Sequence, residues 1–365
     1  MRRRAFVSWM GAAALEAANG GSVRVGVITQ KNGPHLSAYL GGLAESPEAG
    51  PIALCDASGA TVDAARKALG SRLGGVYTDA ASLLAKEKPA VTFVVLEASV
   101  APAAITAALD AGSHVMAEKP ACVRLADFEA LARKAQSRNR QLMLALANRV
   151  DPVMVEARRL IQGGHLGKLY GAELHTIADQ TRLTRADYRQ AWYAQKAKAG
   201  GGHLIWLGIH WIDLAMYLTG RPVREVSAFT TNIGGQPLDV EDSAVVSFRF
   251  DGGALGTLTS GYYLDKGKQL FIKVWGSEGW LEIEKEAKPQ LKWYTRKEGG
   301  RQFEGPLTPS GYSPFVRAVV RSGGGAPPPL TTEDSLMALR TVFASYRSAE
   351  TGKAQPVAAV TSRPT

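Results

Sequence analysis

Short apolar runs alternate with helix-like segments over residues 23–147, and this alternation constrains the fold more than any other feature of the sequence. Strands are predicted at 22–29, 52–56, 91–96, 113–117 and 141–146, and helices at 35–43, 60–69, 101–111 and 125–137. Strands separated by helices of about 10–15 residues pair in parallel, so the segment is predicted to be an α/β domain. Such sheets bind ligands at the carboxyl ends of their strands.

The pattern changes after residue 148. A helix at 153–163 leads into longer alternating runs at 172–177, 223–230, 243–250, 256–261, 270–275 and 280–284, and a last helix is predicted at 333–348. Turns such as Asp251-Gly252-Gly253 separate the runs, which indicates a mostly antiparallel sheet with helices on one face. We therefore expect two domains, at 23–147 and 148–365, a number that suits a chain of 365 residues.

Composition excludes several classes of partner. The formal net charge of +10 is spread along the chain, and neither a basic helix with interleaved aromatic residues nor zinc-finger spacing is present. A nucleic-acid partner is therefore not expected. The two cysteines, Cys55 and Cys122, are too few for a structural zinc site, and no metal is predicted. A basic surface of this kind does attract phosphates or acidic sugars.

Residues 1–22 have the layout of an export signal, because a charged start is followed by a modest apolar stretch and then by small residues. Arg3-Arg4-Ala5-Phe6 is similar to the twin-arginine signal, which predicts a periplasmic protein. Glu16 interrupts the end of the short apolar stretch, so a cytoplasmic location is the alternative. No other stretch approaches the ~18 consecutive apolar residues of a membrane span, and none is expected.

Two segments carry a family resemblance. Residues 111–120, AGSHVMAEKP, resemble the AGKHVLxEKP segment of the Gfo/Idh/MocA oxidoreductases. Gly200-Gly201-Gly202, followed by GIHWID at 208–213, resembles that family's GGG…GxHxxD segment. The resemblance implies a Rossmann domain that binds NAD(P) and an α+β domain that covers it. It also implies a sugar, inositol or related polyol as substrate, held between the domains for hydride transfer.

The first turn departs from the family's G-x-G-x-x-G, since residues 29–34 read TQKNGP and keep one glycine. Glycines there let the backbone turn tightly and approach the diphosphate. Two interpretations are open: the variant loop binds the dinucleotide through Thr29, Lys31, Asn32 and Gly33, or cofactor binding has weakened or vanished. Asp56 favours the first, because an acid at the end of the second strand holds the ribose hydroxyls and favours NAD over NADP. The alternative is that Asp56 merely opens a turn.

Hydride transfer needs an acid or base for the substrate hydroxyl, and the resemblance implies two candidates. Lys119 follows Glu118 at the end of a strand, so both are placed beside the cofactor. Burial there would lower the pKa of the lysine enough for proton transfer. His210 lies on an apolar helical segment, and Asp213, one turn later, is predicted to orient it. A surface lysine and a core histidine are the alternatives.

The predicted substrate site contains a further departure. The family's dehydrogenases carry Asp four residues before the catalytic His, whereas this chain has Trp206. Tryptophan accepts no proton, so we expect it to stack on a sugar or simply to pack. Asn148, Arg149, Trp192 and His210 complete the predicted site. For Arg149, a salt bridge at the domain interface is the alternative.

Three functions follow from these residues. The first is an NAD(P)-dependent dehydrogenase of a sugar or polyol, which the retained Lys119 and His210 favour. The second is a glycosidase of the same fold that uses bound NAD. The third is a non-catalytic sugar- or nucleotide-binding protein with a degraded site. An open sheet face in the second domain, as in this family, would suit a homo-oligomer.

Overall fold

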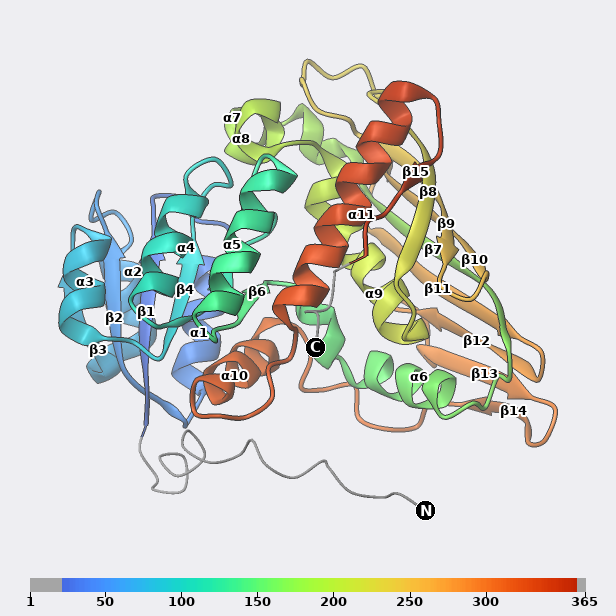
Figure 1. Ribbon diagram of the computed structural model, residues 1–365, viewed down its shortest axis with the longest axis horizontal. Helices are drawn as coiled ribbons and strands as arrows, with labels where there is room; N and C mark the ends of the chain where they lie inside the picture. The colour runs from blue at the N-terminus through green and yellow to red at the C-terminus, as the bar shows by residue number, and fades with distance from the viewer. Residues whose placement is uncertain (1–21, 360–365) are drawn as a thin grey trace.

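Two β-sheets organise the protein, one in each half of the chain (Figure 1). The computed structural model describes residues 22–359. The predicted export signal, apart from its last residue, lies outside the described residues.

The N-terminal sheet is parallel throughout, in the order β3-β2-β1-β4-β5-β6. Its strands are β1 (Val23–Thr29), β2 (Ala49–Asp56), β3 (Leu73–Tyr77), β4 (Val91–Val95), β5 (His114–Ala117) and β6 (Leu142–Leu144). The crossover helices are α1 (Leu36–Glu45), α2 (Val62–Leu69), α3 (Ala80–Glu87), α4 (Ala101–Asp110) and α5 (Leu125–Ser137). The strand order reverses between β1 and β4, and such a reversal opens a ligand crevice at the carboxyl edge of the sheet. The predicted parallel α/β fold is confirmed.

The second sheet is mostly antiparallel, in the order β14-β13-β12-β11-β7-β10-β9-β8-β15, with one parallel pair, β7 and β10. Its strands are β7 (Leu169–Asp179), β8 (Val223–Thr231), β9 (Ser243–Phe250), β10 (Leu255–Leu264), β11 (Lys268–Gly276), β12 (Gly279–Glu284), β13 (Leu291–Thr295), β14 (Gly299–Gln302) and β15 (Gln355–Pro356). The helices α6 (Pro152–Gln162), α9 (Ile209–Thr219) and α11 (Thr332–Thr351) lie between this sheet and the N-terminal domain in Figure 1. The predicted α+β domain is confirmed.

The sequence pattern does not predict β3 and α3, or β13 and the edge strand β14 beside it. Gly74 and Gly75 interrupt the apolar run of β3, and β14 begins with two glycines. Edge strands bury less of their surface, so their apolar periodicity is weak.

Helix α10 (Tyr312–Gly323) also escapes the sequence pattern, and it returns to the N-terminal domain. It packs on α1 so closely that a Cβ on Gly42 would lie 2.8 Å from the Cβ of Val316. A Cβ on Gly323 would lie 2.3 Å from Cγ2 of Val91 in β4. The predicted division at 147/148 therefore differs from the packing at this helix, which belongs to the parallel-sheet domain.

The described residues contain no helix long and apolar enough to cross a membrane. They also contain no group of three or more His, Cys, Asp or Glu side chains placed to hold a metal ion.

Candidate active site between the two domains

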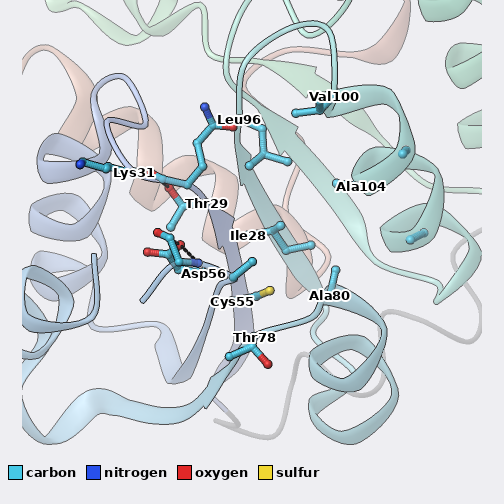
Figure 2. Close-up of a pocket in the computed structure, with 15 residues that line it drawn as sticks. Ile28, Thr29, Lys31, Cys55, Asp56, Thr78, Ala80, Leu96, Val100 and Ala104 are labelled. Atoms are coloured by element: carbon cyan, nitrogen blue, oxygen red, sulfur yellow. Dashed lines mark hydrogen bonds between the residues drawn. The ribbon is translucent and has the colours of Figure 1, made fainter. Parts of the chain in front are cut away.

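A cleft of about 640 Å³ lies at the carboxyl edge of the parallel sheet (Figure 2). It is lined by the ends of β1 and β2, the start of α3 and one face of α4, namely Ile28, Thr29, Gln30, Lys31, Cys55, Asp56, Ala57, Ser58, Thr78, Ala80, Leu96, Val100, Ala103, Ala104 and Ala107. Its position at the reversal of strand order and its largely apolar wall suit the adenosine half of a dinucleotide. Of the predicted cofactor residues, Thr29, Lys31 and Asp56 line it.

The loop from β1 to α1 folds against the neighbouring strand. Thr29 donates to the carbonyl of Val95, and a Cβ on Gly33 would lie 2.7 Å from the Thr29 hydroxyl and 3.0 Å from that carbonyl. Only glycine fits there, which explains why this one glycine remains in the variant loop. The side chain of Gln30 accepts from the backbone N–H of Glu97 at 3.3 Å and so ties the loop to β4. Gln30 is a lining residue that the sequence analysis missed, because its partner is remote in sequence.

Helix α1 begins after this loop without a side-chain cap and without an acidic residue in its first turn. Its amide dipoles therefore stay available to an anion, as at the diphosphate sites of Rossmann domains. Asn32 adopts a left-handed backbone conformation with φ 60° and does not line the cleft. Lys31 is exposed, and in Figure 2 its side chain extends away from Ile28 and Cys55.

Asp56 is buried, and its carboxylate already has four donors. One oxygen accepts from the amide and hydroxyl of Ser58 at 2.9 and 2.8 Å, and the other accepts from the amide and hydroxyl of Thr61, both at 2.8 Å. Burial alone would raise the pKa of Asp56, but these hydrogen bonds outweigh it and lower the pKa. A carboxylate has about four lone-pair sites, so a ribose hydroxyl can bind Asp56 only by displacing one of these donors. In this structure Asp56 therefore makes the contacts expected if it opens a turn, because both carboxylate oxygens bind the turn residues Ser58 and Thr61.

Lys119 is buried under Trp206. Its side chain is 1% exposed, its Nζ donates to the backbone carbonyl of Trp206 at 2.6 Å, and Nζ lies 3.1 Å from the centroid of the Trp206 ring. Burial lowers the pKa of Lys119 to about 7, although the charge of Glu118 acts in the opposite direction. The predicted alternative of a surface lysine is therefore wrong. An ammonium with this pKa can give and take a proton near neutral pH.

Trp206 is held in a stack that spans the two domains. Its ring is parallel to that of Tyr193, with centroids 4.7 Å apart, and to that of His35, with centroids 6.0 Å apart. Trp192 packs edge-on at 5.5 Å. Trp206 lies in η5 (Leu204–Gly208), a π-helical turn just before α9. Such turns recur at functional sites.

Glu118, directly after β5, connects the end of that strand to the start of α1 within the N-terminal domain. Its carboxylate accepts from the hydroxyl of Tyr39, lies 3.0 Å from Nδ1 of His35, and accepts from the amide of Lys119 at 3.1 Å. His35 and Tyr39, which sequence reasoning missed, thus tie α1 to the end of β5. No local sequence pattern signals a contact that spans 79 residues.

His210 lines a second cavity of about 200 Å³, to which both domains contribute residues. Burial is the main cause that lowers the pKa of His210, and the charge of Lys119 adds to it. The imidazole is therefore neutral at pH 7, and its buried Nδ1 has no hydrogen-bond partner among the described residues. The predicted residue Asn148 lines the same cavity.

The predicted contact between Asp213 and His210 is wrong. Asp213 instead pairs with Arg149, whose Nε lies 3.1 and 2.9 Å from the two carboxylate oxygens and whose terminal nitrogen lies 2.6 Å from one of them. Arg149 also lies 3.1 Å from Asp334 of α11. The alternative for Arg149 is a salt bridge at the domain interface, whereas the structure shows a salt bridge whose three residues all lie within 148–365. Arg149 does not line the 200 Å³ cavity, because its guanidinium is committed to these carboxylates.

Two further predicted residues, Trp192 and Trp206, are buried, and neither lines either cavity. Trp192 is 7% exposed, and its ring nitrogen has no partner among the described residues. Trp206 packs over Lys119 and Trp192 packs edge-on against Trp206, so in the conformation seen here neither ring lines a cavity that could hold a sugar.

Comparison with known proteins identifies the family. Residues 25–146 match the oxidoreductase family with an NAD-binding Rossmann fold, and residues 154–282 match the GFO/IDH/MocA C-terminal domain. The two matches follow one another along most of the chain. The chain belongs to the GFO/IDH/MocA oxidoreductase family.

Individual relatives are remote. Levoglucosan dehydrogenase of Pseudarthrobacter phenanthrenivorans is 26% identical over 51% of this chain and 53% of its own length. Myo-inositol 2-dehydrogenase of Thermotoga maritima is 26% identical over 67% of this chain and 73% of its own length. A solved structure of levoglucosan dehydrogenase with NADH and levoglucosan superposes with a TM-score of 0.81 at 20% identity, covering 93% of this chain and all of that one. At that identity the superposition establishes the fold. The first curated relatives are matched over only about half of their length.

Proposed function

We propose that this GFO/IDH/MocA protein is an NAD-dependent oxidoreductase that acts on a sugar or polyol. The observation that carries the proposal is the burial of Lys119, with its pKa lowered to about 7. The parallel sheet also carries a cleft that suits the adenosine half of a dinucleotide, and His210, on which the charge of Lys119 acts, lines a second cavity. Buried groups with displaced pKa values cluster at functional sites. The named activities of the relatives in this family, dehydrogenases of sugars and of inositol, support the same reading.

The residues of the cleft fit a bound dinucleotide. The apolar wall from α4 would face the adenine, and the uncapped start of α1 would face the diphosphate. Bound NAD would supply the hydride acceptor for the reaction. An acid at Asp56 favours NAD over NADP, because a 2′-phosphate beside that carboxylate would be repelled.

The protein's own groups manage the hydroxyl proton. As the substrate carbon loses its hydride, the C–O bond becomes a carbonyl and the hydroxyl proton must go to a base. His210 lines the cavity and is neutral, so it can hydrogen-bond the substrate hydroxyl, but the burial that lowers its pKa also disfavours its protonation. Lys119, with a pKa of about 7, can accept the proton once the ring of Trp206 moves off its Nζ.

The cover over Lys119 favours a second candidate function, a non-catalytic protein that binds a nucleotide or a sugar. Trp206 lies where the family's dehydrogenases carry an acid. Its backbone carbonyl accepts a hydrogen bond from Nζ of Lys119, and its ring covers the same Nζ. If Trp206 never moves, the lysine cannot reach a substrate.

Nucleotide content and turnover separate these functions. The purified full-length chain is denatured, and the released small molecules are identified by absorbance and mass. The native protein is then assayed with NAD and a panel of sugars and polyols. We expect NAD(H) to bind and at least one substrate to be oxidised. Glycoside cleavage without net reduction of NAD would indicate the glycosidase alternative instead.

A variant tests the role of Lys119. Lys119→Met is expected to abolish turnover while NADH still binds, as followed by nucleotide fluorescence, and the exposed Lys67→Met serves as the control. Unchanged turnover in Lys119→Met would reject the role of the lysine. Failure of the wild-type protein to bind nucleotide would reject both enzymatic functions.

We also propose that the chain is exported through Arg3 and Arg4, and that it forms a homo-oligomer through the outer face of its large sheet. Exposed Phe229 and Leu255 on β8 and β10 are consistent with such a contact. Replacement of both arginines by lysine should keep the protein in the cytoplasmic fraction. Light scattering on the purified protein gives the oligomeric state.

A further inference from the structure

We propose that the substrate of this site is an anionic monosaccharide, whose carboxylate or phosphate is held between Arg182 and Lys268. This inference rests on the proposed function and names the substrate class of the same site. It depends on the 200 Å³ cavity beside His210, which brings together residues of both domains.

The floor of this cavity comes from two neighbouring strands. Lys268 pairs with Ala178 and Leu270 pairs with Thr176, so these residues of β11 and β7 line the cavity from adjacent rungs of the sheet. Arg182 follows β7 in η3 (Gln180–Thr184), at the same end of the sheet as Lys268. Arg182 and Lys268 therefore line the same cavity, because the pairing of β7 with β11 places the end of one strand beside the start of the other.

No carboxylate of the described residues lines the cavity beside these two charges, although hydrogen bonds from Thr181 and, to a smaller extent, the charge of Arg182 lower the pKa of Asp179 outside it. The lining contains Arg182, Lys268 and the neutral His210, and it contains no Asp or Glu. The nearby carboxylates bind elsewhere, since Asp179 accepts from the amide and hydroxyl of Thr181 at 2.8 and 2.7 Å, and Asp265 accepts from the side chain of Gln180. Neither cation forms an ion pair with any described residue at 22–359. Arg182 is half-buried and Lys268 is exposed, so Arg182 is the less screened of the two charges. Two cations on the wall of one cavity attract an anionic ligand.

Arg182 is held in place by an aromatic surface. Its guanidinium lies 5.5 Å from the centroid of the Tyr262 ring, and Tyr262 is itself fixed by a 2.9 Å hydrogen bond to the hydroxyl of Tyr188. A guanidinium positioned in this way can bind a carboxylate or a phosphate through two parallel hydrogen bonds.

The rest of the lining suits one sugar ring. The cavity is smaller than the ~300–1,000 Å³ usual for drug-sized ligands, so it suits a monosaccharide better than a nucleotide sugar. Asn148 and Thr176 can bind hydroxyl groups, and the neutral imidazole of His210 is a further polar group in the lining.

Binding to the full-length protein tests the inference. Titration calorimetry, with and without saturating NADH, compares D-glucuronate, D-glucose 6-phosphate and D-glucose, and the two anions distinguish a carboxylate from a phosphate. We expect at least one anion to bind roughly tenfold or more tightly than glucose, since hydrogen bonds to charged groups contribute most to binding. Arg182→Gln and Lys268→Gln should each remove most of that preference, whereas Lys266→Gln, an exposed neighbour outside the cavity lining, should not.

Equal affinity for glucose and the anions would overturn the inference, and so would a preference that survives in both variants. Failure of both anions to bind would overturn it as well. These outcomes are separate from the proposed function: NAD-dependent turnover of neutral sugars alone would leave that function standing. Anion binding without nucleotide binding would support the anion site while rejecting the oxidoreductase.

Discussion

The buried ammonium of Lys119 should make the stability of the folded protein depend on pH. Burial lowers its pKa from the ordinary 10.5 to about 7, whereas the unfolded chain keeps the ordinary value. Between pH 7 and 10.5 the unfolded state therefore binds a proton that the native state has released. Stability rises with pH wherever the unfolded state holds more protons, so this lysine destabilises the fold most below pH 7.

The magnitude follows from the same values. Each unit of pKa difference corresponds to about 1.4 kcal/mol, so the whole effect is about 5 kcal/mol, of which about 4 kcal/mol falls between pH 7 and 10.5. Between pH 7 and 9 about 2 kcal/mol of this is recovered, since the native lysine is already half deprotonated at pH 7. Lys119→Met removes the charge, and its stability should lack this dependence.

Urea unfolding of the wild-type protein and of Lys119→Met at pH 7, 8 and 9 measures the difference. We expect the wild type to gain about 2 kcal/mol relative to the variant as the pH rises from 7 to 9. The same comparison with Lys67→Met, at an exposed position on α2, should give no such trend. A difference between the wild type and Lys119→Met that stays constant with pH would show that Lys119 keeps an ordinary pKa, and the acid–base role proposed for it would lose its physical basis.

Three further predictions concern other parts of the site. Asp213→Ala removes the buried partner of the Arg149 guanidinium and leaves it only the more exposed Asp334, so it should cost about 3 kcal/mol in urea unfolding, and a cost below about 1 kcal/mol would contradict the buried ion pair. Gly33→Val should weaken NADH binding at least tenfold, because its Cβ would meet the Thr29 hydroxyl at 2.7 Å, whereas Gly41→Ala, which meets nothing within 4 Å, should bind normally. Trp206→Ala should cost about 3–5 kcal/mol and expose Lys119 to amine-reactive labels, as read by peptide mass spectrometry. Labelling of Lys119 in the wild type at the same rate would show that Trp206 does not cover it.

Much of the architecture was predictable because its signals are local. The apolar runs of β1, β4 and β5 are buried on both faces, so their residue types report strand and parallel pairing together. The EKP and GGG…GxHxxD segments gave the family, and family matches over 25–146 and 154–282 confirm it. The sequence alone also shows that the loop after β1 lacks the family's other glycines and keeps Gly33, and the structure shows that packing at Gly33 leaves no room for a side chain.

The contacts of the site were decided by the tertiary structure. Trp206 lies 87 residues from the lysine that it covers. Asp213 binds Arg149, which is 64 residues away in the sequence, and does not bind His210, which lies one helical turn before it. A helical spacing of three residues allows a contact between Asp213 and His210. A buried guanidinium, however, forms stronger, charge-assisted hydrogen bonds to a carboxylate than a neutral imidazole does, and the fold brings that guanidinium within reach. Likewise, no sequence pattern joins Arg182 to Lys268, because only the register of β7 against β11 carries both into one cavity. Periodicity reports which face of an element is buried, whereas the partners across that face depend on how distant elements pack.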